Sequence, residues 1–222
     1  MKYVIGNWKM NGDAAKLAAF RGTLSDRAFL CVPFHLLSAG LGAQDCSAFP
    51  EGPRTGEVSA KMIAAAGARA CIVGHSERRR NFAETNEIVA EKAARCLEAG
   101  LVPIICVGET DKGAPLSIVE SQVWQSVPKA DSIKGGIIVA YEPVWAIGTG
   151  LVPTPADIEK VHAAIAKILE TLGLSGTAIL YGGSVTAANA AEIMALKNVG
   201  GVLVGGASLD LNQFTEIINA GK

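Results

Sequence analysis

The sequence predicts a closed barrel in which eight parallel β-strands alternate with helices, the (β/α)8 architecture. Short, continuous apolar runs recur along the 222 residues and do not alternate with polar residues, which is typical of parallel strands buried on both faces. Segments with helical periodicity separate these runs, as βα units require. Eight such units leave about 28 residues for each, close to the minimum length of the repeat.

The expected strands are 3–5, 29–32, 41–43, 70–73, 102–107, 137–140, 178–181 and 202–204, of which 41–43 gives the weakest signal. An open, doubly wound sheet also fits this alternation. It would need a Gly-x-Gly-x-x-Gly turn after the first strand, and the segment 6–12 does not match that pattern. The closed barrel is therefore favoured. Because no linker divides the chain, we expect residues 1–222 to form a single (β/α)8 barrel domain.

The helical segment with the clearest pattern is 155–172, where apolar residues recur at spacings of three and four. Thr154 is expected to cap its N-terminus, Pro155 suits the first helical position, and Gly173 ends it. A second helix is expected to begin at 117–120, where serine and glutamate have the spacing of a capping box.

The chain is shorter than the 250 residues or so that are usual for this fold. From Val32 to Gln44 only 12 positions remain for a loop, a helix and a strand. The second helix should therefore be one or two turns around residues 36–39, and the first, between Gly12 and Arg27, should also be brief. We expect shortened outer helices near units 1 and 2, at a cost in packing and stability but not in chemistry.

Composition excludes several classes of protein. Half of the residues are hydrophobic and 18% are charged, so the chain is not disordered. The net charge of −1 offers no attraction for nucleic acid or an anionic membrane, and no apolar run is long enough to span a bilayer. The chain starts without a signal-peptide pattern. Five cysteines without CxxC spacing favour buried thiols over disulfides or a zinc site, and hence a cytoplasmic location.

Reactive groups of such a barrel lie where its strands end at the C-terminal edge. The polar and glycine residues there are Asn7 and Lys9, then His75, Ser76 and Glu77, then Glu142, then 182–184, and finally Gly205 and Gly206. Each has an ordinary alternative: a solvated lysine, a glutamate in a salt bridge, a structural histidine, a tight glycine turn. Their shared position favours a site in which the glycine-rich turns bind phosphate through backbone N–H groups.

Seven segments, in this order, also match a known family: 6–12 (GNWKMNG), 55–59 (TGEVS), 72–79 (IVGHSERR), 106–109 (CVGE), 140–150 (AYEPVWAIGTG), 181–185 (YGGSV) and 201–209 (GVLVGGASL). Over nearly its whole length the chain resembles the triosephosphate isomerase family, whose fold is the TIM barrel. The segment around Glu142 alone is highly specific.

The resemblance implies that dihydroxyacetone phosphate and D-glyceraldehyde 3-phosphate interconvert through an enediolate, with Glu142 as the base. His75 would polarise the carbonyl as a neutral imidazole whose pKa a helix N-terminus lowers, the established pattern for this family. Lys9 would supply positive charge and Asn7 an amide donor. The phosphate would be held by Gly148, Ser184, Gly205 and Gly206, with Ser76, Glu77, Thr55, Leu203 and Ile147 in support. Neither a metal nor an organic cofactor is implied.

The resemblance also implies two features beyond the reacting groups. Residues 146–150 would be the tip of a lid that excludes water, although Leu151 stands where the family usually has lysine. The loop 44–57 would insert into a second subunit, so that Thr55 braces Lys9 or Asn7 across a homodimer interface.

Two other functions remain as alternatives. Another phosphate-binding barrel enzyme would need an Asp/Cys acid–base pair or a Schiff-base lysine at a mid-barrel strand end, and the strand runs contain no such lysine. A relative that only binds phosphate would be favoured by loss of Lys9, His75 or Glu142, and all three are present.

Overall fold

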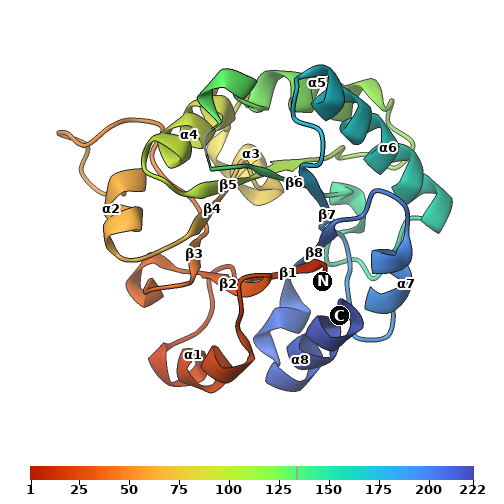
Figure 1. Ribbon diagram of the computed structural model, residues 1–222, viewed down its shortest axis with the longest axis horizontal. Helices are drawn as coiled ribbons and strands as arrows, with labels where there is room; N and C mark the ends of the chain where they lie inside the picture. The colour runs from red at the N-terminus through yellow and green to blue at the C-terminus, as the bar shows by residue number, and fades with distance from the viewer. Residues whose placement is uncertain (134) are drawn as a thin grey trace.

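The computed structural model describes residues 1–133 and 135–222, and its strands form one closed parallel barrel in the order β1 to β8 (Figure 1). Closure comes from β8 pairing with β1, which places Tyr3 opposite Gly201. The strands are β1 (Tyr3–Asn7), β2 (Ala28–Val32), β3 (Gly42–Ala43), β4 (Ala70–Val73), β5 (Val102–Val107), β6 (Ile138–Tyr141), β7 (Ala178–Tyr181) and β8 (Gly201–Val204). The predicted barrel is thus confirmed, including the short third strand.

Helices surround this barrel, as Figure 1 shows. They are α1 (Ala14–Phe20), α2 (Ala60–Ala65), α3 (Ser76–Phe82), α4 (Asn86–Glu98), α5 (Ser117–Ser126), α6 (Pro155–Thr171), α7 (Ala190–Ala195) and α8 (Leu211–Ala220). Single 3-10 turns add η1 (Arg21–Thr23), η2 (Phe34–Leu36), η3 (Ala130–Ser132), η4 (Val144–Ala146) and η5 (Gly206–Leu209).

Each strand contributes to two apolar layers, which explains why the runs do not alternate. Side chains of one parity, such as Ile5 and Ile72, fill the barrel interior. Those of the other parity, such as Val4 and Cys71, pack between the barrel and the helices. Because both faces are buried, nearly every strand position must be apolar.

The two helix starts differ in how well the sequence predicted them. Thr154 caps α6 as expected: its side chain accepts the N–H of Asp157, and the Asp157 side chain accepts the N–H of Thr154. The capping box expected at Ser117 is wrong. The backbone of Leu116 is already helical, so Ser117 lies inside the first turn and has no capping hydrogen bond. A cap requires extended backbone at the serine itself.

The expected shortening of the outer helices is confirmed, with one change of position. Between β2 and β3 only the turn η2 is present, and it begins two residues before the expected segment 36–39 and ends at Leu36. Pro33 begins this turn because its ring fixes φ near the helical value, and Leu37 returns to extended backbone. All eight strands are present, so the shortening removed helix and left the barrel closed.

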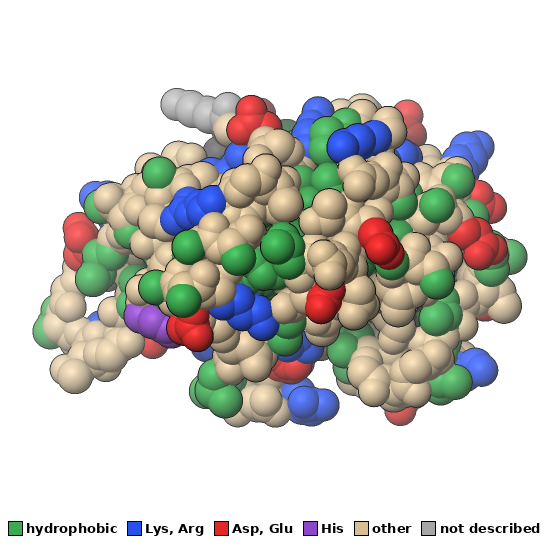
Figure 2. Space-filling model, turned by 90° about the horizontal axis from the view of Figure 1, so that it is seen from below, with side chains coloured by type: hydrophobic (Ala, Val, Ile, Leu, Met, Phe, Trp, Pro, Cys, Tyr) green, Lys and Arg blue, Asp and Glu red, His purple; other side chains and the backbone are tan. Residues whose placement is uncertain are grey.

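Charges on the outer surface are mixed. Figure 2 shows acidic and basic side chains interspersed on one face, without a field of a single sign. None of the helices in the described ranges is both long enough and apolar enough to span a membrane.

Candidate active site

A cavity of about 380 Å³ opens at the C-terminal end of the barrel. Every residue predicted to be catalytic or to bind substrate lines it, together with two of the supporting residues. These are Asn7, Lys9, His75, Glu142, Gly148, Ser184, Gly205 and Gly206, with Ile147 and Leu203. Residues from β1, β4, β6, β7 and β8 therefore meet in one place, because parallel strands end at the same edge of the barrel.

Glu142 lies directly after β6 and is almost completely buried. Its Oε1 is 3.0 Å from Nε2 of His75, and its Oε2 accepts the backbone N–H of Ser76 at 3.1 Å. Gly108 allows this position, since a Cβ atom there would lie 1.7 Å from the carbonyl oxygen of Glu142. The carboxylate is thus held by fixed donors and aimed into the cavity.

His75 and Glu142 shift each other's pKa. Burial raises the pKa of the Glu142 carboxyl, but His75, the N–H of Ser76 and Lys9 lower it more, so it lies below its ordinary value. Burial lowers the pKa of His75, but Glu142 and Glu77 outweigh burial and raise it. The expected lowering of the His75 pKa is therefore wrong for the unliganded site, because the carboxylate of Glu142 touches the ring.

The tautomer of His75 follows from its second ring nitrogen. Nδ1 lies 3.2 Å from the backbone nitrogen of Glu77, in the first turn of α3. A backbone N–H can only donate, so Nδ1 must accept and carries no proton. The neutral ring therefore carries its proton on Nε2, where it faces Glu142 and the cavity. In this tautomer His75 presents a hydrogen-bond donor to anything that binds there.

Lys9 sits in a strained turn that several neighbours fix. Its φ of 52° lies in the left-handed region, which residues other than glycine rarely adopt. Its backbone N–H donates to Asn7, its carbonyl accepts from the Gln44 side chain at 2.9 Å, and its ammonium pairs with Glu77 at 2.6 Å. A positive charge is thereby placed at the cavity beside the glycine-rich turn at Gly205, where an added Cβ would lie 3.9 Å from Cε of Lys9.

The glycine-rich turns also line the cavity. Gly205 and Gly206 lead into η5, and Ser184 follows β7. The Ser184 hydroxyl donates to the carbonyl of Ala146 at 2.9 Å, which connects this wall to the segment 146–150. Backbone N–H groups at such turns are suited to a phosphate.

The segment 146–150 covers one side of the cavity and is anchored at its base. The indole of Trp145 donates to Oε1 of Glu109 at 2.7 Å, and the Tyr141 hydroxyl donates to the same oxygen at 3.0 Å. Gly148 has a φ of 71° and lines the cavity. An anchored base and a tip with glycine conformations are features of a lid.

Three supporting residues lie outside this cavity. Ser76 and Glu77 are next to it and act on Glu142, His75 and Lys9 by the contacts above. Thr55 is exposed on the loop between β3 and α2, which extends away from the barrel in Figure 1. The sequence reasoning missed Gln44 and Gln213. Gln213 lines the cavity, and Gln44 donates to the carbonyl of Lys9. Gln44 directly follows β3, so its position at the end of a strand is the signal that points to it.

A (β/α)8 barrel with a buried carboxylate, an imidazole and a lysine facing glycine-rich turns defines an acid–base enzyme of a phosphorylated small molecule. The comparisons with known proteins agree. The family model for triosephosphate isomerase matches residues 2–221. The chain belongs to the triosephosphate isomerase family.

Individual relatives cover nearly the whole chain. The triosephosphate isomerase of Bradyrhizobium sp. (strain ORS 278) is 46% identical, covering 96% of this chain and 95% of that protein. The enzyme of Ruegeria pomeroyi is 47% identical, covering 99% and 96%. A crystal structure of triosephosphate isomerase from Bartonella henselae superposes with a TM-score of 0.87 at 37% identity, covering 99% of this chain and 98% of that one. The alignment with the Bradyrhizobium protein spans 240 positions, more than the 222 residues of this chain. The chain is therefore shorter than that relative at positions inside the aligned region.

Proposed function

We propose that this protein interconverts dihydroxyacetone phosphate and D-glyceraldehyde 3-phosphate. The observation that carries the proposal is the contact of Glu142 with His75 in the same cavity as Lys9 and the turn at 205–206. A carboxylate and an imidazole can move a proton, and the glycine-rich turns of the same cavity can hold a phosphate. The cavity of about 380 Å³ suits a small ligand.

The mechanism we infer uses Glu142 as the base. The substrate enters between Glu142 and His75, and Glu142 takes a proton from the carbon next to the carbonyl. The Nε2–H of His75 donates to the carbonyl oxygen as negative charge develops there. The Nε2 position of His75 also passes the proton of the neighbouring hydroxyl group to the former carbonyl oxygen, so that the two oxygens exchange roles. Glu142 then returns its proton to the neighbouring carbon of the enediolate, which leaves the new carbonyl at the carbon that was deprotonated first. A neutral ring suits this role, because an imidazolium would give up its proton outright.

Lys9 and Asn7 stabilise the developing charge from the other side, and preorganised donors of this kind act most strongly in a site closed to water. Gly148, Ser184, Gly205 and Gly206 hold the phosphate, with Leu203 and Ile147 lining the pocket. Residues 146–150 form the tip of the lid, and its closure over the cavity excludes water. We assign the acid–base chemistry to the side chains of Glu142 and His75, without a cofactor.

The test is a coupled assay with dihydroxyacetone phosphate on the wild type and Glu142→Asp. Shortening the side chain by one methylene withdraws the base from the reacting carbon, so we expect kcat to fall by about 10²-fold or more. The matched control is Glu216→Asp on the exposed side of α8, which should leave kcat unchanged. No isomerase activity in the wild type, or full activity in Glu142→Asp, would refute the proposal.

We also propose that the chain acts as a single barrel domain in the cytoplasm. All eight strands belong to one closed sheet, which supports a single domain. Five buried, unpaired cysteines support a reducing compartment.

Finally, we propose a homodimer formed through the loop 44–57. A cavity of about 500 Å³ next to Lys9 and His75 has exposed apolar side chains at its edge, among them Met10, Phe34 and Phe82. The projecting loop of a second copy is the occupant we assign to it. An apolar rim of this kind supports an interface.

Sedimentation at several concentrations tests the dimer. Met10 is 95% exposed, so Met10→Asp should leave the fold intact while weakening the dimer. Ile118→Asp, on α5, changes an exposed apolar residue elsewhere and serves as the control. A monomeric wild type at micromolar concentration, or equal dimerisation of both variants, would contradict this interface.

A further inference from the structure

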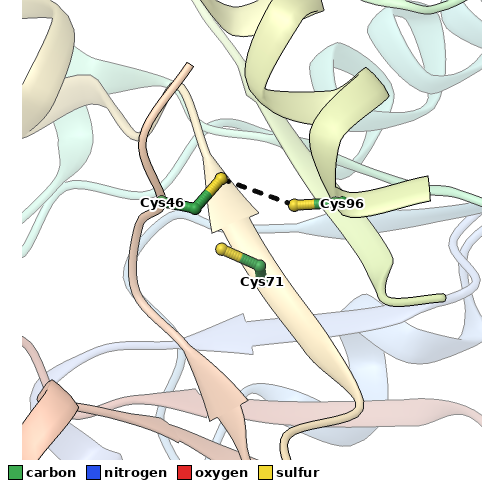
Figure 3. Close-up of side chains that lie close together, drawn as sticks. All are labelled: Cys46, Cys71 and Cys96. Carbon is green, nitrogen blue, oxygen red and sulfur yellow. Dashed lines mark hydrogen bonds between the residues drawn. The ribbon is translucent and has the colours of Figure 1, made fainter. Parts of the chain in front are cut away.

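Three cysteines from different parts of the chain meet between the barrel and its outer helices. Cys46 belongs to the loop after β3, Cys71 to β4 and Cys96 to α4, and all three are buried. Figure 3 shows their side chains directed toward one another. Their sulfur atoms all lie within 4.8 Å of one another, and those of Cys46 and Cys96 are 3.6 Å apart.

These separations match the needs of a metal ion. An ion with metal–sulfur bonds of about 2.3 Å requires sulfurs roughly 3.8–4.0 Å apart, in tetrahedral or trigonal geometry. The three thiols therefore need to move by less than about 1 Å to bind one ion together.

The surroundings restrict which ion fits. The metal-ligand group found among the described residues holds these three sulfurs and includes no histidine or carboxylate. The Cys46 thiol also lies 3.7 Å from the carbonyl oxygen of Lys92, which is not a donor that soft metals prefer. Structural zinc is almost always four-coordinate. Three sulfurs without a fourth ligand favour a soft ion that accepts three-coordination.

The charged groups nearby are already paired with one another. Lys92 and Arg78 both pair with Asp45 and Glu84, at distances of 2.5–2.9 Å. Two cations and two anions balance in this cluster, so it adds no net negative charge beside the three sulfurs. Copper(I) with three thiolates carries a charge of −2.

We propose that Cys46, Cys71 and Cys96 form a binding site for one thiophilic metal ion in all-sulfur, three-coordinate geometry, for which copper(I) is the best match. Binding of one Cu⁺ by the three cysteines deprotonates all three thiols, so it releases three protons and forms three copper–sulfur bonds, with no change of oxidation state. The site is independent of the reaction proposed above, because none of its residues lines the catalytic cavity.

Occupancy has a structural consequence. The ion would join the loop after β3 to β4 and to α4, and this loop is the segment proposed to form the dimer. A ligand that binds only the folded state raises its stability in proportion to the logarithm of its concentration. Copper(I) should therefore raise the Tm of the reduced protein.

The experiment is an anaerobic titration of the fully reduced protein with Cu(I) in competition with bicinchoninate. We expect the wild type to withdraw one equivalent of copper. Cys46→Ala, Cys71→Ala and Cys96→Ala should each bind about 100-fold more weakly or worse, because each loses a ligand. Cys31→Ala is the matched control: Cys31 is equally buried but lies in the barrel interior, and this variant should bind like the wild type.

X-ray absorption at the copper edge of the wild-type complex needs no variant and should show three sulfur neighbours. The proposal is overturned if the wild type leaves the copper with the competitor, or if the spectrum shows nitrogen or oxygen ligands. It is also overturned if the three cluster variants keep wild-type affinity. Tighter binding of Zn²⁺ than of Cu(I) would contradict the three-coordinate assignment.

Discussion

At the scale of single residues, the contact between Glu142 and His75 changes what the site can do before substrate arrives. The 3.0 Å contact lowers the pKa of the carboxyl and raises that of the ring. A substrate placed between them would break this contact. The N–H of Glu77 at Nδ1 would remain, and it favours the neutral ring.

We therefore expect different pH dependence for free and substrate-bound enzyme. The profile of kcat/KM reports the free enzyme, and that of kcat reports the complex. The pKa of His75 in the free enzyme lies above 6.5, so kcat/KM should fall as the pH drops through a value above 6.5. The profile of kcat should fall only at a lower pH. Steady-state kinetics between pH 5 and 9 measure both.

The phosphate of the substrate also titrates, with a second pKa of about 6. His75→Gln separates the two effects, since it keeps the substrate and removes the ring. In this slower variant the decrease of kcat/KM that protonation of His75 causes should disappear. Only the decrease near the pKa of the substrate phosphate should remain. Coincident acid limbs for kcat and kcat/KM in the wild type would contradict the assignment.

At the scale of elements, the lid that we propose at residues 146–150 depends on backbone conformations that glycine provides. Gly148 has a φ of 71°, and a Cβ there would meet nothing within 4 Å. Gly148→Ala therefore strains only the backbone, by about 1–2 kcal/mol. We expect it to lower kcat/KM, because the lid tip lines the cavity.

Gly100→Ala is a matched control for that substitution. Gly100 has a φ of 77°, equally open space around its Cβ, and a position after α4. Both variants should lose similar stability in urea denaturation, and only Gly148→Ala should lose activity. Equal activity in the two would mean that the lid tolerates the strain.

A second pair of substitutions tests the helix starts. Thr154→Ala removes a reciprocal cap from α6 and should lower the free energy of unfolding by about 1 kcal/mol. Ser117→Ala should cost much less, because Ser117 lies inside the first turn of α5 and makes no capping hydrogen bond. Urea denaturation of both variants measures the difference. A loss at Ser117 as large as that at Thr154 would contradict this view.

These two helix starts also show which parts of the fold the sequence could predict. Thr154 is followed by Pro155, which favours one starting point, so pattern and structure agree. At Ser117 the same type of pattern follows Leu116, whose backbone is already helical. The carbonyl of Pro115 already accepts the N–H of Ile118, so the turn begins before the serine, and the spacing of serine and glutamate does not reveal this.

The candidate site was predictable for a related reason. Positions at the ends of parallel strands must converge, so Lys9, His75 and Glu142 could be placed together from the order of the strands alone. The sulfur cluster could not be placed in this way. Cys46, Cys71 and Cys96 belong to a loop, a strand and a helix without motif spacing, and their contact depends on how α4 packs.

At the scale of the whole molecule, the barrel is complete where the helical ring is reduced. The ring is reduced to η2 between β2 and β3, yet all eight strands pair and the cavity keeps its lining. The strands fix the site because every reacting group follows directly from a strand end. Helices far from the mouth contribute burial, so their loss affects stability first.

One buried histidine should contribute to the pH dependence of the molecule's stability. His162 on α6 is fully buried, its Nδ1 lies 3.2 Å from the Asn198 carbonyl oxygen, and its Nε2 has no partner among the described residues. Burial lowers its pKa to about 4, whereas the unfolded chain takes up a proton near pH 6.5. Between these values the unfolded state binds more protons, so stability is fully present above pH 6.5 and falls as the pH drops toward 4. The loss reaches about 3 kcal/mol.

His162→Phe keeps an aromatic ring against Tyr141 and removes the titration. Urea denaturation from pH 7 to pH 4.5 should therefore show the variant gaining on the wild type as the pH falls. If the free energies of unfolding of the two proteins differ by the same amount across this range, the pKa of His162 is not lowered in the folded protein and the prediction is wrong.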